Sequence, residues 1–218
     1  MLAHLATLTV PAYLAALNAL LAIAFFVITR RKFTELRSRL AIAEYNASHD
    51  DLTGLLNRRA ILAHLQTQLD TGRAVTIAVL DFDDFKAIND NDGHAAGDAA
   101  LIEAAHQLRT LPVTAGRLGG DEFLIVTTAD ARTGAVHAAA AQAAISTASI
   151  ETAGRTIALS ATAGMAHAPA GIRAADLMRR ADRAMYAAKH AGIPLQAYHD
   201  LIPDVPAHVP PRRRTYRP

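Results

Sequence analysis

The distribution of apolar and charged positions separates the start of the chain from the rest. Residues 8–29 contain no charged side chain, and about 20 apolar residues are enough to cross a bilayer as a helix. The basic run Arg30-Arg31-Lys32 follows directly. Because basic residues favour the cytoplasmic end of a membrane helix, the pattern predicts a single-pass anchor over residues 1–32. The N-terminus would lie outside the membrane and the remaining chain in the cytoplasm.

A second apolar stripe follows the basic residues. Its members recur at steps of three and four, at Phe33, Leu36, Leu40, Ala43 and Ala47, as in the a and d positions of a coiled coil. Two heptads with two alanines make a thin seam, so a lone amphipathic helix packed on its own domain explains the stripe nearly as well. The sequence therefore predicts a linker helix over residues 33–48 and leaves its packing partner open.

Helical and strand patterns interleave in the remaining chain. Helical spacing of apolar residues predicts helices over 60–69, 97–108, 133–149 and 173–191. Apolar or alternating runs predict strands over 74–82, 122–128 and 156–166, the last with a bulge at Gly164. These elements predict an α+β fold with helices packed against a mostly antiparallel sheet. Residues 200–218 are rich in proline and arginine and predict a disordered tail.

Composition narrows the chemistry. The chain has 218 residues and no cysteine, which excludes disulfides, thiol catalysis and cysteine-ligated zinc. Its formal net charge of +2 is too small to indicate a nucleic-acid partner.

Two carboxylates lie on a glycine turn at Gly119-Gly120-Asp121-Glu122, directly before the apolar run 123–126. Glycine allows close approach of a backbone or a phosphate, and carboxylates are ligands for hard divalent cations. By itself, an acidic hairpin tip explains such a turn equally well.

A second acidic segment favours a functional site. Asp81 stands where the predicted strand 74–82 ends, and Lys86, Asn89 and Asp98 follow it. A single aspartate at a strand end is commonly a turn cap, but this reading weakens when three further polar residues accompany it.

Four segments in this order resemble the motifs of GGDEF-domain diguanylate cyclases. They are His49–Arg59, Asp81–Asp98, Gly119–Phe123 and Ala181–Lys189. The resemblance spans residues 49–199 and implies the palm-like, ferredoxin-related nucleotidyl cyclase fold. It also implies condensation of two GTP into cyclic di-GMP with release of two pyrophosphates. The enzyme would be a homodimer with one GTP per protomer, anchored in a bacterial cell membrane.

The resemblance further implies roles for individual residues. Asp81, the backbone carbonyl of Phe82 and Asp121 would hold Mg²⁺, two ions per active half-site, with Mn²⁺ as a substitute. The catalytic residues would be Asp121, Glu122 and Lys86. The substrate-binding residues would be Phe85, Lys86, Asn89, Asp98, Gly120 and Lys189. Asp98 would select guanine, because a carboxylate accepts from the N1–H and N2–H₂ groups that adenine lacks. A role for Asp98 as the N-cap of the following helix is compatible with this.

Two positions depart from the family pattern. Arg109 has no aspartate three residues later, so the family's inhibitory product site is expected to be absent. Ile193 stands where the family usually has a phosphate-binding arginine, and the loss of one such contact costs about 1–3 kcal/mol. Intact acidic residues favour an active cyclase. Ile193 favours the alternative, a catalytically inactive GGDEF module that binds GTP or dimerises in signalling.

Overall fold

The computed structural model describes residues 2–168 and 171–202, with side-chain exposure described from residue 14 onward. The chain divides into two compact units, one ending at Ala47 and the other beginning at Ser48. The predicted tail lies largely outside the described residues, because residues 203–218 are not among them.

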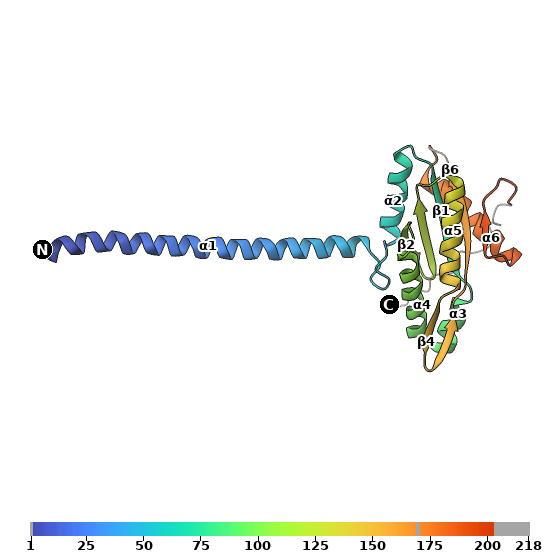
Figure 1. Cartoon of the computed structure of the whole chain (residues 1–218), viewed down its shortest axis with the longest axis horizontal. Helices are drawn as coiled ribbons and strands as arrows, with labels where there is room; N and C mark the ends of the chain where they lie inside the picture. The colour runs from blue at the N-terminus through green and yellow to red at the C-terminus, as the bar shows by residue number, and fades with distance from the viewer. Residues whose placement is uncertain (1, 169–170, 203–218) are drawn as a thin grey trace. The chain divides into compact units, whose positions relative to one another are not determined.

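The first unit is formed by one helix, α1 (Leu2–Ser48), which runs without interruption through the predicted anchor and linker (Figure 1). The part from Leu14 to Ser48 contains a stretch long and apolar enough to cross a membrane, with a mean hydropathy of 1.7. Phe33, Leu36 and Leu40 of the linker stripe are 55%, 64% and 59% exposed.

The second unit is built on a five-stranded sheet with the strand order β2-β3-β1-β6-β7. The strands are β1 (Val75–Phe82), β2 (Thr114–Gly119), β3 (Glu122–Thr127), β6 (Ala161–Ala168) and β7 (Leu195–Ala197). β1 pairs antiparallel with β3 and with β6, and only β7 is added in parallel. Every residue of β1 is buried, as its continuous apolar sequence predicts for a central strand. The predicted α+β fold with a mostly antiparallel sheet is confirmed.

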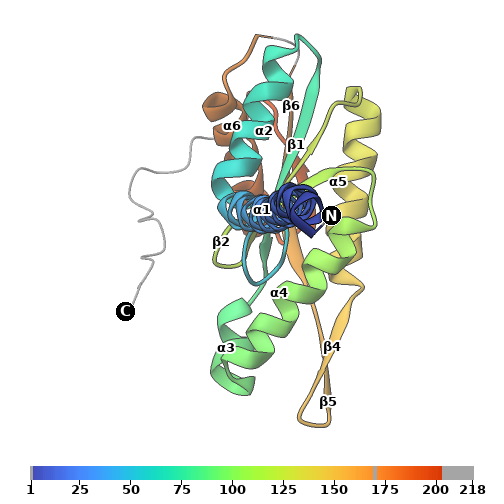
Figure 2. The same ribbon diagram turned by 90° about the vertical axis from the view of Figure 1, so that its left-hand side faces the viewer.

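Helices cover both faces of this sheet (Figure 2). α2 (Arg58–Asp70) and α6 (Ala174–Ala191) pack on one face, and α4 (His94–Arg109) and α5 (Ala131–Ser146) pack on the other. Successive side chains of a strand point to opposite faces of the sheet, so alternate residues of β1 pack into the two hydrophobic cores on its two faces. Val75, Ile77 and Val79 join the core beneath α2 and α6. Asp81 continues this set and is therefore directed toward the α2 and α6 face.

Two details differ from the sequence prediction. Residues 156–166 are not one strand but parts of β5 (Arg155–Ala158) and β6, and β5 pairs with β4 (Ser149–Thr152) in a separate hairpin. Gly164 is not a bulge, since the register between β1 and β6 is unbroken. A Cβ atom on Gly164 would lie 2.1 Å from the backbone nitrogen of Met185. Glycine at this position lets α6 lie directly on the sheet.

Candidate active site

The signature turn, defined as Gly119–Glu122, joins β2 to β3 at the end of the sheet where β1 also ends. Gly119 and Gly120 have φ angles of 129° and 59°, which only glycine adopts at little cost. Glu122 pairs with Asp81 in the register between β3 and β1. The amide of Phe82 also donates to the carbonyl oxygen of Asp121 at 3.4 Å. The structure thus brings the two acidic segments together.

Asp81 and Phe82 direct oxygen atoms toward a single cation. The Asp81 residue is only 8% exposed, and its Oδ1 accepts a hydrogen bond from Nζ of Lys189 on α6. The same Nζ lies 3.4 Å from the carbonyl oxygen of Phe82 and 3.8 Å from Oδ1 of Asp83. Convergent hard oxygens of this kind are also what Mg²⁺ requires.

Asp83 is a member of this cluster that the sequence pattern did not single out. Its Oδ1 accepts from the Thr162 hydroxyl at 2.8 Å and its Oδ2 from the Ser160 hydroxyl at 2.7 Å. Its amide donates to the Ser160 carbonyl at 2.9 Å. In the sequence, the only indication that Asp83 belongs to the site is its place two residues after Asp81. Its hydroxyl partners, Ser160 and Thr162, come from a distant segment and could not be predicted. In the part of the chain that the structure describes, no three His, Asp or Glu side chains form a metal cage by themselves.

After β1 the chain enters a short helix, α3 (Phe85–Asp92), which is not among the helices predicted from the sequence. Asp84 at its N-cap is left-handed, with φ 54° and ψ 28°. Phe85 and the exposed Lys86 form the first turn, where backbone N–H groups have no acceptor within the helix. Left-handed residues beside right-handed ones form concave nests of amides that bind anions. Phe85 and Lys86, which were predicted to bind the substrate, therefore lie at the start of a helix.

Asn89 and Asp98 lie on two consecutive helices that pack against each other, α3 and α4. The Asn89 amide donates to the Phe85 carbonyl at 3.3 Å, while Asp98 is exposed. A Cβ atom on Gly97 would lie 2.2 Å from Oδ1 of Asn89, so Gly97 makes room for this side chain. α4 begins at His94, with Gly93 as its cap. The N-cap role considered for Asp98 is therefore wrong.

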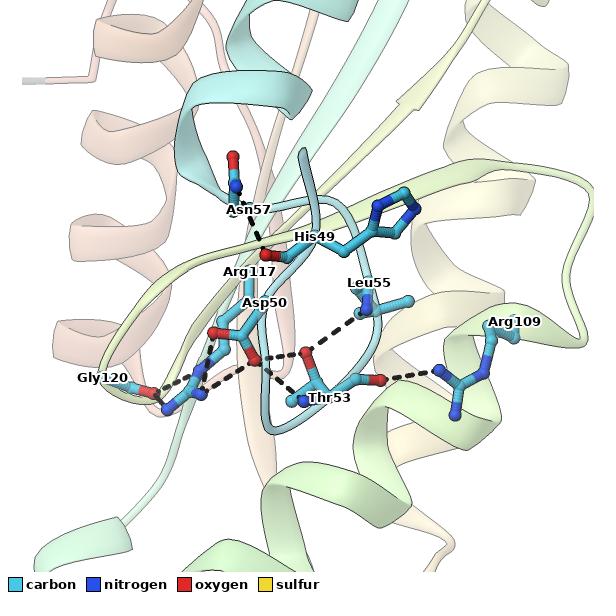
Figure 3. Close-up of polar contacts among 8 residues, drawn as sticks. All are labelled: His49, Asp50, Thr53, Leu55, Asn57, Arg109, Arg117 and Gly120. Carbon is cyan, nitrogen blue, oxygen red and sulfur yellow. Dashed lines mark hydrogen bonds and ion pairs between the residues drawn. The ribbon is translucent and has the colours of Figure 1, made fainter. Parts of the chain in front are cut away.

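Arginine side chains hold the backbone on both sides of the signature turn. Nη1 of Arg58 donates to the Leu118 carbonyl at 3.4 Å. Nε and Nη2 of Arg117 donate to the Gly120 carbonyl at 3.0 and 2.8 Å (Figure 3). Sequence reasoning missed Arg117, for which the sole signal was its place two residues before the glycine pair.

Asp182 on α6 has a perturbed carboxyl group. Loss of hydration raises the pKa of Asp182 from 3.8 to about 6, the Glu122 carboxylate adds to the rise, and Arg58 opposes it. A carboxyl whose pKa rises on folding favours the folded state most below pH 3.8 and loses that contribution as pH rises through about 6. Asp182 is exposed, so solvent screens part of its contribution to the stability of the folded state.

Of the recesses on the second unit, two are lined in part by α6. One, of about 510 Å³, is lined by eleven residues that include Asp83, Asp84, Lys189 and Ile193. It therefore adjoins the cation-binding oxygens. The larger one, of about 740 Å³, is lined by Ile172, Tyr198 and five residues of α6. This larger recess contains none of the predicted nucleotide-binding residues, so the smaller one is the better candidate for a substrate phosphate.

The two departures from the expected pattern have structural roles of their own. Nη1 of Arg109 donates to the Thr53 carbonyl at 2.7 Å. The amide of Ile193 donates to the Ala188 carbonyl at 3.1 Å, just after the left-handed Gly192 that ends α6. Neither residue replaces the missing acidic or basic side chain.

Solved structures share this architecture. The coiled coil and GGDEF domain of DgcB from Caulobacter crescentus, in complex with c-di-GMP, has a TM-score of 0.73 and 27% identity. The similarity covers 80% of this chain and 97% of that one. Diguanylate cyclase SiaD of Pseudomonas aeruginosa, in complex with its activator SiaC, has a TM-score of 0.66 and 27% identity over 84% of this chain and 73% of its own.

Curated proteins show the same relationship. An uncharacterised signalling protein of Caulobacter vibrioides is 39% identical over 171 residues, 72% of this chain. Diguanylate cyclase VdcA of Vibrio cholerae is 40% identical over 98 residues, 44% of this chain. The chain matches only 21% and 29% of the lengths of these two relatives. Residues 47–193 match the family described as diguanylate cyclase, GGDEF domain. The chain therefore belongs to the GGDEF-domain family of diguanylate cyclases.

Proposed function

We propose that this chain is an active diguanylate cyclase, which condenses two GTP into cyclic di-GMP and releases two pyrophosphates. The observation that carries the proposal is the convergence of the Asp81 carboxylate and the Phe82 carbonyl on one cation. This position lies one strand away from the turn that bears Asp121. Family membership supports the class of reaction.

The proposed metal ligands are Asp81, the Phe82 carbonyl and Asp121. Their donor set fits Mg²⁺, because all are hard oxygens and two of them already converge on the Lys189 ammonium. Two Mg²⁺ per half-site are expected, with Mn²⁺ as a substitute. A metal bound there would neutralise charge on the triphosphate and lower the pKa of the ribose 3′-hydroxyl. Asp121, with Glu122 beside it, receives the proton of that hydroxyl.

The remaining residues bind and orient the nucleotide. The amides at the start of α3, at Phe85 and Lys86, and the open Gly120 turn receive phosphate oxygens. Lys86 and Lys189 add positive charge to the triphosphate, and Lys86 offsets the charge that develops during transfer. Asn89 and Asp98 hydrogen-bond the guanine edge, which gives GTP an advantage over ATP.

Gly97→Ala tests the guanine site. The added methyl group displaces the Asn89 amide, so the dissociation constant for GTP is expected to rise about tenfold, the equivalent of one hydrogen bond. The melting temperature should stay level or rise, because alanine favours a helix interior over glycine. Isothermal titration of GTP and thermal melting measure both effects.

The matched control for this experiment is Asn89→Ala. It should weaken GTP to a similar degree, and adding Gly97→Ala to it should change little further. Unaltered GTP affinity in the Gly97→Ala protein would contradict the proposed role of Asn89.

The condensation joins two nucleotides, so we propose a homodimer in which each protomer holds one GTP. Twofold symmetry then brings two equivalent half-sites face to face. The stripe at Phe33, Leu36 and Leu40 is the proposed contact between the two α1 helices. The exposure of these side chains supports it.

The proposed organisation has four parts. Residues 1–32 anchor the chain in a bacterial cell membrane, with the N-terminus outside. Residues 33–48 are a linker helix, residues 49–199 are the cytoplasmic catalytic domain, and residues 200–218 are a tail. The apolar stretch of α1 and the basic run after it support this orientation.

The alternative is a silent module that binds GTP without turnover, and Ile193 is the observation that favours it. Without the arginine of the family pattern, we expect a raised Michaelis constant for GTP rather than loss of activity, because the proposed metal ligands are intact.

The identity of the product distinguishes the two functions. The full chain in detergent micelles is incubated with Mg²⁺ and either GTP or ATP, and the nucleotides are separated. Cyclic di-GMP from GTP supports the proposal, and bound but unconverted GTP supports the alternative.

Lys189→Met tests the convergence of oxygens on one cation. The Lys189 ammonium contacts Asp81 and therefore competes with a metal for that carboxylate. Without nucleotide, Lys189→Met is expected to bind Mn²⁺ about tenfold more tightly than the parent, since removal of about 1.4 kcal/mol of competition changes a constant tenfold. Electron paramagnetic resonance of free Mn²⁺ measures this constant.

The matched control is Lys86→Met, which removes the same charge from an exposed position on α3. It should leave Mn²⁺ affinity within about threefold of the parent, as expected for a screened surface charge. Equal Mn²⁺ affinity of Lys189→Met and Lys86→Met would contradict competition between the Lys189 ammonium and a metal at Asp81.

A further inference from the structure

Arg117 joins two segments that are far apart in the sequence. Its Nε and Nη2 atoms donate to the Gly120 carbonyl at 3.0 and 2.8 Å. Its Nη1 atom lies 3.1 and 3.2 Å from the two carboxylate oxygens of Asp50. Figure 3 shows the guanidinium between the signature turn and the turn that carries Asp50. The Arg117 side chain is 14% exposed, so solvent screens these contacts only weakly.

Asp50 belongs to a firmly held loop, here called the Asp50 turn and defined as residues 49–57. Its Oδ1 accepts from the Thr53 amide at 2.9 Å and from the Thr53 hydroxyl at 2.6 Å. Burial works to raise the pKa of Asp50, but the hydrogen bonds from Thr53 and the neighbouring Arg117 hold it below its usual value. The backbone adds bonds from the Asp50 amide to Leu55 and from the Asn57 amide to Ser48. Arg117 is therefore tied to a rigid support.

The backbone pairing that leads into the signature turn is irregular. The register between β2 and β3 shifts between Arg117 and Gly119 and resumes with Gly119 opposite Glu122. Gly120 has no side chain that limits its rotation, and its φ of 59° lies where glycine is the least constrained residue. Two hydrogen bonds from one planar guanidinium fix the direction of the Gly120 carbonyl. They thereby fix the peptide plane from which Asp121 begins.

We propose that Arg117 is a positioning residue that aligns Asp121 for catalysis by coupling the signature turn to the Asp50 turn. The inference rests on the proposed cyclase function. Asp50 follows the last residue of α1, Ser48, by only two positions. The coupling therefore connects the site to the segment of chain that arrives directly from the helix.

The test compares Arg117→Lys, Arg117→Gln and Asp50→Asn in the full chain. Lysine keeps the charge opposite Asp50 but cannot donate the two parallel bonds to the Gly120 carbonyl. Both Arg117 variants are expected to lower kcat about 30- to 100-fold, as small misplacements of reacting groups do. The KM for GTP should change less than threefold. Asp50→Asn should lower kcat less, and adding it to Arg117→Gln should have no further effect.

Arg109→Gln is the matched control. Arg109 also holds the Asp50 turn, through the Thr53 carbonyl at 2.7 Å, but it has no hydrogen bond to the signature turn in the part of the chain that the structure describes. If Arg117 acts by positioning, Arg109→Gln should change kcat less than threefold. Equal losses of kcat in Arg109→Gln and Arg117→Gln, in step with equal losses of melting temperature, would overturn the proposal.

A second readout does not require turnover. Arg117→Gln should speed amide hydrogen exchange in residues 119–122 at least tenfold, whereas Arg109→Gln should leave exchange there unchanged. If the parent makes no product, this exchange experiment still tests the coupling, and the failure then belongs to the proposed function alone. Unchanged exchange in Arg117→Gln would overturn the coupling itself.

Discussion

Asp121→Asn is expected to lower the rate of cyclic di-GMP formation about 1,000-fold, which corresponds to about 4 kcal/mol of transition-state stabilisation. Asparagine preserves the size of the side chain but removes the negative charge that would attract Mg²⁺ and the basic oxygen that would receive a proton. Asp121 lies on a turn whose conformation is set by Gly119 and Gly120. The substitution should therefore leave the fold intact. The rate is measured by product chromatography at saturating GTP and Mg²⁺, together with the melting temperature.

The matched control is Asp70→Asn. Asp70 ends α2, is exposed and accepts a hydrogen bond from Gln66 at 2.7 Å. Asp70→Asn removes one carboxylate of the same kind from outside the proposed site. Its rate of cyclic di-GMP formation should therefore stay within twofold of that of the parent. A rate for Asp121→Asn within tenfold of the parent would mean that Asp121 is neither a metal ligand nor a proton acceptor.

Disruption of the α1 stripe is expected to lower activity about 100-fold at nanomolar protein. In the double variant Leu36→Gln with Leu40→Gln, two large exposed apolar side chains are replaced by polar ones. A paired helix holds two domains at an effective concentration near millimolar, an advantage of about 10²–10⁴ over free encounter. Without it, the rate per protomer should rise with protein concentration and approach the parent value at high concentration. The measurement is initial rate against concentration of the full chain in detergent.

Ile42→Gln provides the control for this second experiment. Ile42 is 60% exposed on the same helix but lies outside the a and d positions, so its loss should leave the concentration dependence unchanged. If Ile42→Gln and the double variant behave alike, the stripe is not the contact between protomers.

The central strands β1 and β3 and the long helices were predictable because apolar periodicity reports directly on local structure. The run 74–82 predicted β1, and the glycine pair before 123–126 predicted the turn between β2 and β3. The stretch 156–166 was predicted wrongly as one strand. Its alternation continues through residues 159–160 and into β6, and periodicity alone does not mark where one strand ends and the next begins.

The sequence predicted which residues belong to the proposed site. It did not predict the contacts that these residues make. Asp50 and Arg117 are 67 positions apart, and their meeting depends on the register of β2 beside the Asp50 turn. Lys189 was expected to bind the substrate, but its contact with Asp81 in the folded chain was not predictable from the sequence. Gly164 suggested a bulge, because the sequence does not show that α6 would approach the sheet at that residue. In each case the deciding neighbour comes from a distant segment.

The measurement that tests the central claim most directly is the simultaneous quantitation of cyclic di-GMP and pyrophosphate formed from GTP by the full chain with Mg²⁺. The account predicts two pyrophosphates for each cyclic di-GMP, and neither product from Asp81→Asn. Recovery of unchanged GTP, or its conversion to GDP and phosphate, would contradict it.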